Sequence, residues 1–223
     1  MAKASRAFVC QACGAVTSRW AGKCAACGEW DSIIEEPAPA GSPSLVAIKG
    51  GKGRLTDLET LGAATGQAPR LPTGMAELDR VLGGGLVPGS AVLLGGDPGI
   101  GKSTLLLQAA AALTGSGAPA LYLSGEEAPA QIKMRAARLG LAKAPVALGA
   151  ETNLANILAT LGSAPAPALI VIDSVQTLWS DSVEAAPGTI SQLRGCASAL
   201  IAHAKASGSA LILIGHVTKD GQI

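Results

Sequence analysis

A glycine-rich run between an apolar segment and a helix-forming segment constrains the fold more than any other feature. The run consists of Gly96, Asp97, Pro98, Gly99, Ile100, Gly101, Lys102, Ser103 and Thr104 and satisfies G-x-x-x-x-G-K-[ST]. Glycines let backbone N–H groups curl around phosphates, because no Cβ is in the way. Lys102 can reach the β- and γ-phosphates, and Ser103 offers a hydroxyl to Mg²⁺. The run therefore predicts a nucleotide-binding loop, with ATP and Mg²⁺ as the expected cofactors.

The residues around this loop favour a strand–turn–helix unit. Residues 91–94 are an apolar run typical of a buried strand, and residues 105–113 are strong helix formers that stop before Gly115. This context argues against a mere glycine-rich connection with a surface lysine. Strand-like runs at 120–123, 146–148, 169–172 and 210–214 alternate with helix-like runs at 130–139, 154–161 and 190–206. The alternation predicts an α/β fold with a mainly parallel sheet between two helical layers.

Carboxylates follow two of the expected strands. The run 169–172 ends in Asp173, which would hold Mg²⁺ at the carboxyl edge of the sheet or, alternatively, cap the next turn. Glu126 and Glu127 follow the run 120–123. One of them can act as general base toward water, or both can stabilise the next helix through its dipole. We favour catalysis, with Glu126 ahead, because adjacent side chains cannot face one water in the same way.

His216 follows the last expected strand. A polar side chain there can report the presence of a γ-phosphate, whereas the alternative is a surface histidine without a role. The candidate catalytic residues are Lys102, Glu126, Glu127, Asp173 and His216.

Four of the five cysteines form two C-x-x-C pairs, Cys10 with Cys13 and Cys24 with Cys27. Two such pairs in so short a segment suit one tetrahedral Zn²⁺ better than disulfides or a redox pair. A four-cysteine site is closed, so a structural role is expected, with the metal supplying folding energy. Trp20 and Trp30 are expected to cover the site, and stacking on bases is the alternative.

Composition limits the remaining choices. A net charge of +1 gives no overall attraction to nucleic acid or membrane, and no apolar stretch approaches the roughly 18 residues of a membrane span. Together with the clustered cysteines, this predicts a cytoplasmic protein. We expect a finger at 1–34, a Pro/Ala/Gly/Ser-rich flexible linker at 35–60, and an ATPase core at 61–223.

The order of motifs resembles the RadA (Sms) family of bacterial DNA repair proteins. The matching segments are the finger, residues 74–90, 95–103, 124–127 (SGEE), 172–177 (IDSVQT) and 215–221 (GHVTKDG). The resemblance implies a RecA-like P-loop NTPase core preceded by a zinc-ribbon-like finger. It also implies ATP-driven branch migration of recombination intermediates, single-stranded DNA binding, partnership with RecA and a homo-hexameric ring in the full-length protein.

The sequence departs from this family in one respect. It stops at Ile223 and lacks the Lys-Asn-Arg-Phe-Gly motif and the Lon-like domain that the family carries after the core. We therefore expect a C-terminally incomplete core that builds a nucleotide site without efficient turnover or branch migration. Two alternatives stay open: another RecA-like ATPase, of replicative-helicase or clock type, and a non-catalytic zinc and nucleotide interaction module.

Overall fold

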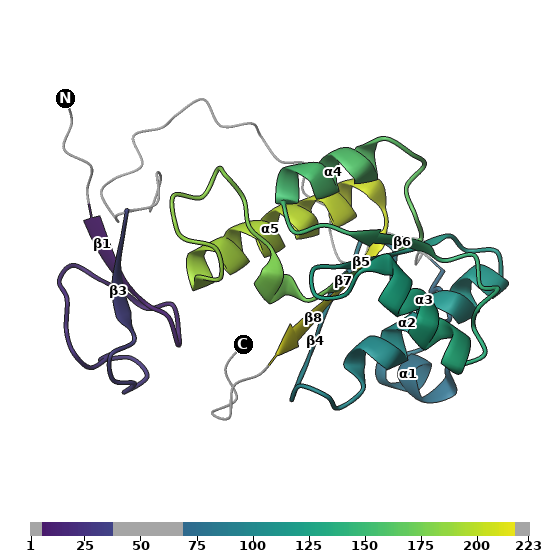
Figure 1. Cartoon of the computed structure of the whole chain (residues 1–223), viewed down its shortest axis with the longest axis horizontal. Coiled ribbons are helices and arrows are strands. Elements are labelled where there is room, and N and C mark those ends of the chain that lie inside the picture. The colour runs from purple at the N-terminus through teal and green to yellow at the C-terminus, as the bar shows by residue number, and fades with distance from the viewer. Residues whose placement is uncertain (1–5, 38–68, 217–223) are drawn as a thin grey trace, which may run out of the picture.

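The computed structural model describes residues 6–37 and 69–216, which form two sheets (Figure 1). The small sheet is antiparallel, with the order β2-β1-β3; its strands are β1 (Arg6–Cys10), β2 (Val16–Thr17) and β3 (Ile33–Pro37). The large sheet has the order β4-β8-β7-β5-β6, and all its neighbouring strands are parallel. Its strands are β4 (Ala91–Gly96), β5 (Ala120–Ser124), β6 (Ala147–Ala150), β7 (Leu169–Asp173) and β8 (Ala210–His216).

Helices cover both faces of the large sheet. They are α1 (Ala76–Val81), α2 (Lys102–Gly115), α3 (Pro129–Arg138), α4 (Leu154–Gly162) and α5 (Ile190–Ser207), with a 3₁₀ turn η1 (Val175–Thr177). One apolar core joins the sheet to α2 and α3, and a second joins it to α4 and α5. The predicted three-layer α/β architecture is thus confirmed.

The central strand β7 explains why the layers form. All five of its residues are buried. Leu169 and Val171 belong to the core under α2 and α3, whereas Ile170 and Ile172 belong to the core under α4 and α5. Full burial of such a side chain contributes about 1.5–3 kcal/mol, so this strand alone strongly favours a covered sheet.

Side-chain caps set the helix ends near the expected residues. Asn153 Oδ1 accepts from the amides of Ala155 and Asn156 at the start of α4. The Thr189 side chain caps α5, which ends at Gly208 in the left-handed conformation with φ 76°. The short helix α1 was not among the expected elements.

The small sheet contacts the core at the N-terminal turn of α5 (Figure 1). Gln11 Oε1 accepts from the amide of Ile190 at 3.2 Å, and its Nε2 donates to Glu36 at 2.9 Å. The Glu36 carboxylate is 4% exposed and also accepts from the hydroxyl of Ser191. A carboxylate is favourable here because the first turn of a helix carries partial positive charge.

Arg194 in α5 adds a second link between the core and the small N-terminal unit. Its guanidinium donates to the carbonyl oxygens of Cys13 and Gly14, both at 3.1 Å. Strand β3 runs to Pro37, past residue 34, where we expected the finger to end. Most of the expected linker, from residue 38 to 60, lies outside the described residues.

Candidate functional site

The glycine-rich run lies between the end of β4 and the start of α2, as the sequence predicts. Gly99 and Gly101 have φ values of +80° and +101°, in the left-handed region that favours glycine. A Cβ added at either residue would meet no atom within 4 Å. Backbone conformation, and not crowding, therefore requires glycine at these two positions.

The ammonium of Lys102 is held against the same loop. Its Nζ donates to the carbonyl oxygens of Gly96 at 2.7 Å and Asp97 at 2.8 Å. Lys102 is only 6% exposed, and a buried charge requires such partners. The loop therefore presents a positive charge at the carboxyl edge of the sheet.

Asp173 lies at the carboxyl end of β7, where the sequence places it, and is 4% exposed. Its Oδ2 accepts a hydrogen bond from the hydroxyl of Tyr122 in β5. The same hydroxyl oxygen lies 3.5 Å from the carbonyl oxygen of Ser103, in the first turn of α2. Burial and then the charge of Asp173 raise the pKa of Tyr122, so its hydroxyl keeps its proton and acts as donor.

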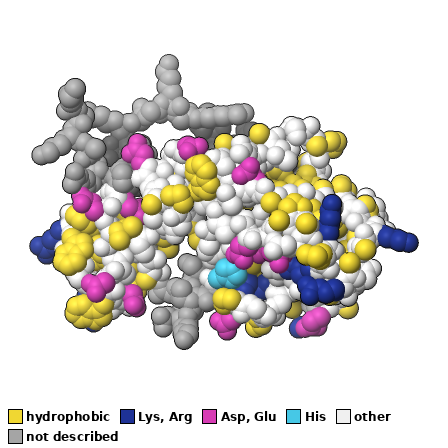
Figure 2. Space-filling view, viewed as in Figure 1, with side chains coloured by type: hydrophobic (Ala, Val, Ile, Leu, Met, Phe, Trp, Pro, Cys, Tyr) yellow, Lys and Arg dark blue, Asp and Glu magenta, His cyan; other side chains and the backbone are white. Residues whose placement is uncertain are grey.

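Glu126 follows β5 and His216 ends β8, and the two side chains meet across β7, which lies between these strands. Ser124 Oγ accepts from the amides of Glu126 and Glu127 at 3.2 and 2.9 Å, which turns the chain at the end of β5. Glu126 Oε1 then accepts from the hydroxyl of Ser174 at 2.7 Å and lies 3.0 Å from Nε2 of His216. Figure 2 shows histidine, acidic and basic side chains gathered in the lower middle of the visible face.

The surroundings of Glu126 favour its ionised form. Partial burial alone would raise its pKa, but the hydrogen bond from Ser174 and the interaction with His216 outweigh burial, with a further contribution from Lys102. The pKa of Glu126 is therefore held below its ordinary value. At neutral pH this carboxylate is able to accept a proton.

Glu127 has a different partner. Its Oε2 lies 2.8 Å from Nη2 of Arg135 in α3, whose side chain is only 14% exposed. The two adjacent glutamates thus differ in environment: Glu126 lies with Ser174 and His216, and Glu127 pairs with the next helix.

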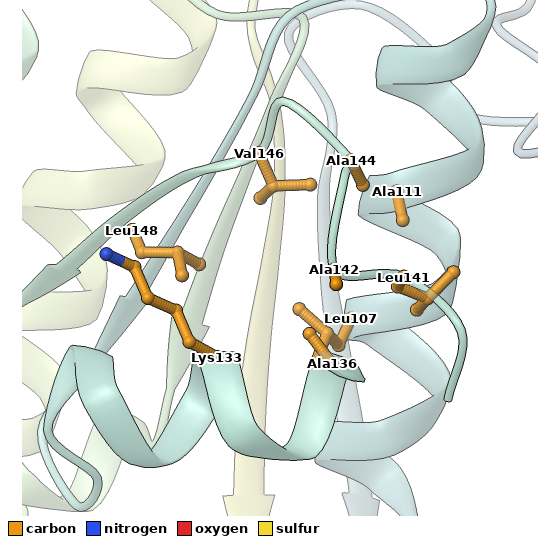
Figure 3. A pocket seen from close by; sticks show the side chains of 9 residues that line it. All are labelled: Leu107, Ala111, Lys133, Ala136, Leu141, Ala142, Ala144, Val146 and Leu148. Carbon is orange, nitrogen blue, oxygen red and sulfur yellow. The ribbon is translucent and has the colours of Figure 1, made fainter. Parts of the chain in front are cut away.

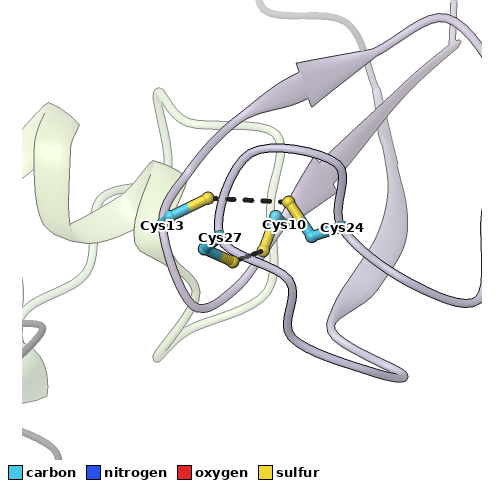
Figure 4. Close-up of side chains that lie close together, drawn as sticks. All are labelled: Cys10, Cys13, Cys24 and Cys27. Atoms are coloured by element: carbon cyan, nitrogen blue, oxygen red, sulfur yellow. Dashed lines mark hydrogen bonds between the residues drawn. The ribbon is translucent and has the colours of Figure 1, made fainter. Parts of the chain in front are cut away.

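The four clustered cysteines converge in the small sheet (Figure 4). Their sulfur atoms lie within 4.8 Å of one another, and the Cys10–Cys27 and Cys13–Cys24 distances are both 3.7 Å. A tetrahedral Zn²⁺ with Zn–S bonds of about 2.3 Å places its sulfurs about 3.8 Å apart, whereas a disulfide requires about 2.05 Å. The geometry therefore fits one four-cysteine metal site and argues against the disulfide alternative.

The local hydrogen bonds favour the thiolate form of Cys10. Burial would raise the pKa of Cys10, but hydrogen bonds with Ser32 and with backbone amides in the same turn hold it at about 6. Thiolate is the form that binds metal.

The expected packing role of Trp20 and Trp30 is wrong. They are 61% and 66% exposed, and the Lys23 ammonium lies 5.3 Å from the ring centre of Trp30. Ile33 and Phe8, from the strands themselves, pack against the cysteines instead. Because these two strand residues fill the space beside the cysteines, the tryptophan side chains stay exposed to solvent.

Several contacts at the site escaped sequence reasoning, which treated Tyr122 only as a strand residue. A buried tyrosine hydroxyl requires a hydrogen-bond partner, so a tyrosine in an apolar strand indicates a polar contact in the core. Ser174 carried no comparable signal, because its partner Glu126 is 48 residues away in the sequence. The pairing of Arg135 with Glu127 depends on where α3 lies relative to the end of β5, which the sequence pattern does not show.

A pocket of about 220 Å³ lies away from this edge, between α2, α3 and β6 (Figure 3). Its lining is apolar apart from Lys133. Ligand pockets are usually about 300–1,000 Å³, so this one is small for a substrate site.

Fold and site together define a RecA-like P-loop core joined to a four-cysteine ribbon. The chain belongs to the AAA domain family, whose model matches residues 63–222, and the model of the rubredoxin metal binding domain matches residues 8–35. It is 55% identical to the DNA repair protein RadA of Brucella abortus (strain 2308), 47% to that of Pseudomonas aeruginosa and 42% to that of Bacillus subtilis (strain 168). Each comparison covers 100% of this chain and 49% of the relative, so the chain spans about half the length of these proteins.

Within residues 6–37 and 69–216, no helix is long and apolar enough to cross a bilayer.

Proposed function

We propose that this chain forms the ATP-binding and ATP-hydrolysing part of a DNA repair protein. The observation that carries the proposal is the convergence on Glu126 of Ser174 and His216, at the sheet edge that also carries Lys102 and Asp173. The similarity to proteins named DNA repair protein RadA supports the biological setting.

In this proposal, the loop from Gly96 to Thr104 binds the phosphates, with Lys102 directed at the β- and γ-phosphates. The Ser103 hydroxyl and the Asp173 carboxylate are oxygen donors of the kind that Mg²⁺ prefers. The Tyr122 hydroxyl lies 3.5 Å from the Ser103 backbone carbonyl and donates to the Asp173 carboxylate, which brings the two residues to the same part of the site. Mg²⁺ held by them would neutralise charge that develops on the phosphates.

Glu126 is the proposed general base, because Ser174 and His216 hold its carboxylate at the strand ends. Its lowered pKa keeps this carboxylate ionised at neutral pH. Glu127 is proposed to be structural, because it pairs with Arg135. Among the described residues, no hydrogen-bond partner reaches the buried Nδ1 of His216. That atom is available to respond to a γ-phosphate, and Gln176 holds the backbone there by donating to the His216 carbonyl at 3.2 Å.

The similarity to the RadA proteins extends the proposal to finer points. These are binding of single-stranded DNA and recombination intermediates, branch migration, partnership with RecA and assembly of the whole protein as a homo-hexamer. Zn²⁺ is the proposed metal of the ribbon, because its four thiolates and their spacing suit a structural zinc site.

The test compares the unchanged chain with Lys102→Ala, Glu126→Gln and Glu127→Gln. Nucleotide affinity and ATP hydrolysis are measured with and without single-stranded DNA, and metal content is measured on the same samples. Lys102→Ala should lose nucleotide affinity. Glu126→Gln should retain affinity and lose about 10²- to 10⁴-fold in hydrolysis, the usual contribution of a general base.

Glu127→Gln is the matched control and should change hydrolysis by only a few-fold. An equal loss in Glu127→Gln and Glu126→Gln would reject the assignment of the base. ATP binding by the unchanged chain without hydrolysis in either condition would favour the non-catalytic interaction module instead.

A further inference from the structure

Tyr122 connects two parts of the site that are distant in sequence, the first turn of α2 and the end of β7. It lies in the middle of β5, is fully buried and is the single tyrosine of the chain. Its hydroxyl group reaches the edge of the sheet at which Asp173 ends β7. A fully buried hydroxyl persists only where it has a partner.

Strand register explains why a tyrosine is required at this position. Ser124 pairs with Asp173 and Tyr122 with Val171, so Tyr122 lies two residues before the register position of Asp173. Side chains alternate along a strand, which puts Tyr122 and Asp173 on the same face of the sheet, toward α2. Only a long side chain spans such a diagonal, and phenylalanine has the same ring but lacks the terminal hydroxyl that reaches Asp173.

The hydroxyl has one proton, and Asp173 Oδ2 is the better acceptor than the more distant Ser103 carbonyl. This bond uses one of the two carboxylate oxygens of Asp173, Oδ2, and leaves Oδ1 to bind another group. Arg135, which pairs with Glu127, lies beside the same hydroxyl and supplies positive charge from α3.

We infer that Tyr122 is a positioning residue, whose hydroxyl fixes the orientation of the Asp173 carboxylate for Mg²⁺ at the nucleotide site. The inference rests on the proposed function, because it concerns the same metal. Tyr122 acts through Asp173 and touches neither nucleotide nor metal in this role. Partners of this outer kind typically change metal affinity by about 10- to 100-fold.

The first test compares Tyr122→Phe with Thr114→Val in the full chain. Thr114→Val is the matched control, because it removes another buried hydroxyl, one that donates to the Ala111 carbonyl at 2.9 Å within α2. Affinity for Mn²⁺ in the presence of ADP is measured by electron paramagnetic resonance, and ADP affinity is measured separately in EDTA.

Tyr122→Phe should weaken Mn²⁺ binding about tenfold and leave metal-free ADP affinity within twofold, whereas Thr114→Val should change neither. Unchanged Mn²⁺ affinity in Tyr122→Phe would overturn the inference while leaving the proposed function intact. Equal weakening of metal-free ADP binding would also overturn it, since that result indicates general damage to the site. Failure of the unchanged chain to bind ADP would overturn both.

A second measurement leaves Tyr122 unchanged and remains decisive if Tyr122→Phe does not fold. Growth on 3-fluorotyrosine labels only position 122, because the chain has no other tyrosine. With ADP bound, adding Mg²⁺ should shift the ¹⁹F resonance, and the shift should disappear in Asp173→Asn. A resonance that Mg²⁺ leaves unmoved in the unchanged chain, despite measured Mg²⁺–ADP binding, would overturn the inference.

Discussion

The contact between ribbon and core makes a quantitative prediction about two matched glycines. Gly14 and Gly28 each follow the second cysteine of a C-x-x-C pair, with φ values of +69° and +79°. A Cβ at Gly14 would overlap the Arg194 guanidinium, whereas at Gly28 the nearest atom, in Lys23, is 3.8 Å away. Alanine at either position therefore costs similar backbone strain, about 1–2 kcal/mol, and only Gly14→Ala also displaces Arg194.

The additional cost follows from the two hydrogen bonds that Arg194 donates. Hydrogen bonds of charged groups contribute about 1.5–3 kcal/mol each, and exposure of Arg194 reduces this to about 0.5–1 kcal/mol each. The loss is then about 1–2 kcal/mol in total. Because folding of a small metal ribbon is coupled to metal binding, Gly14→Ala should bind zinc about 5- to 30-fold more weakly than Gly28→Ala.

Zinc affinity is measured by competition with a chromophoric chelator at pH 7. Arg194→Ala alone should weaken zinc binding to a similar extent, and in that background the two alanine variants should become equal. Equal affinities of Gly14→Ala and Gly28→Ala with Arg194 present would refute the reasoning, as would an Arg194→Ala chain that binds zinc like the unchanged chain.

Three further predictions concern the core and the metal. Ser174→Ala removes a hydrogen bond that lowers the pKa of Glu126. Because the pKa of Glu126 is lowered by folding, this carboxylate stabilises the folded state above its unfolded-state pKa, and the stabilisation is lost as pH falls through the folded-state pKa. Without the Ser174 hydroxyl the pKa of Glu126 should rise, so the acid limb of the hydrolysis profile should move to higher pH in Ser174→Ala. An unmoved limb contradicts this role of Ser174. Gly125→Ala would place a Cβ inside the Thr177 hydroxyl, so denaturant unfolding should show a loss of about 1–3 kcal/mol, whereas Gly162→Ala has open space and should be near neutral. Removing the metal with a chelator should release amide protection in β1 and β3 while β7 stays protected in hydrogen exchange, and loss of protection in both sheets would contradict independent cores.

The sequence predicts those parts of the site that depend on neighbours along the chain. The glycine-rich run, its flanking strand and helix, and Asp173 after an apolar strand are recognisable because each signal is contiguous. Glu126 and Glu127 are adjacent and equivalent at this level. Their environments differ because their partners differ. Strand register brings Ser174 to Glu126 from 48 residues away, and helix packing brings Arg135 of α3 to Glu127.

The metal cluster shows the same division. Cysteine spacing is enough to predict a tetrahedral site, because the ligands are close in sequence. The prediction that Trp20 and Trp30 cover the site is wrong, because Phe8 and Ile33 fill the space beside the cysteines. The pairing of β1 with β3 brings these two residues there. That pairing depends on residues on both sides of the finger, and no local pattern reports it.

The contacts of α5 have a mechanical consequence. The helix has 18 residues and is about 27 Å long at 1.5 Å per residue. Its N-terminal end is bonded to the ribbon through Ile190 and Arg194, and its far end leads through Gly208 into β8, which ends at His216. A helix is stiff along its axis, so a displacement of the ribbon is transmitted through α5 to the strand that carries His216. The hydrogen bonds of Ile190, Ser191 and Arg194 are contacts that a separation of ribbon and core would have to break.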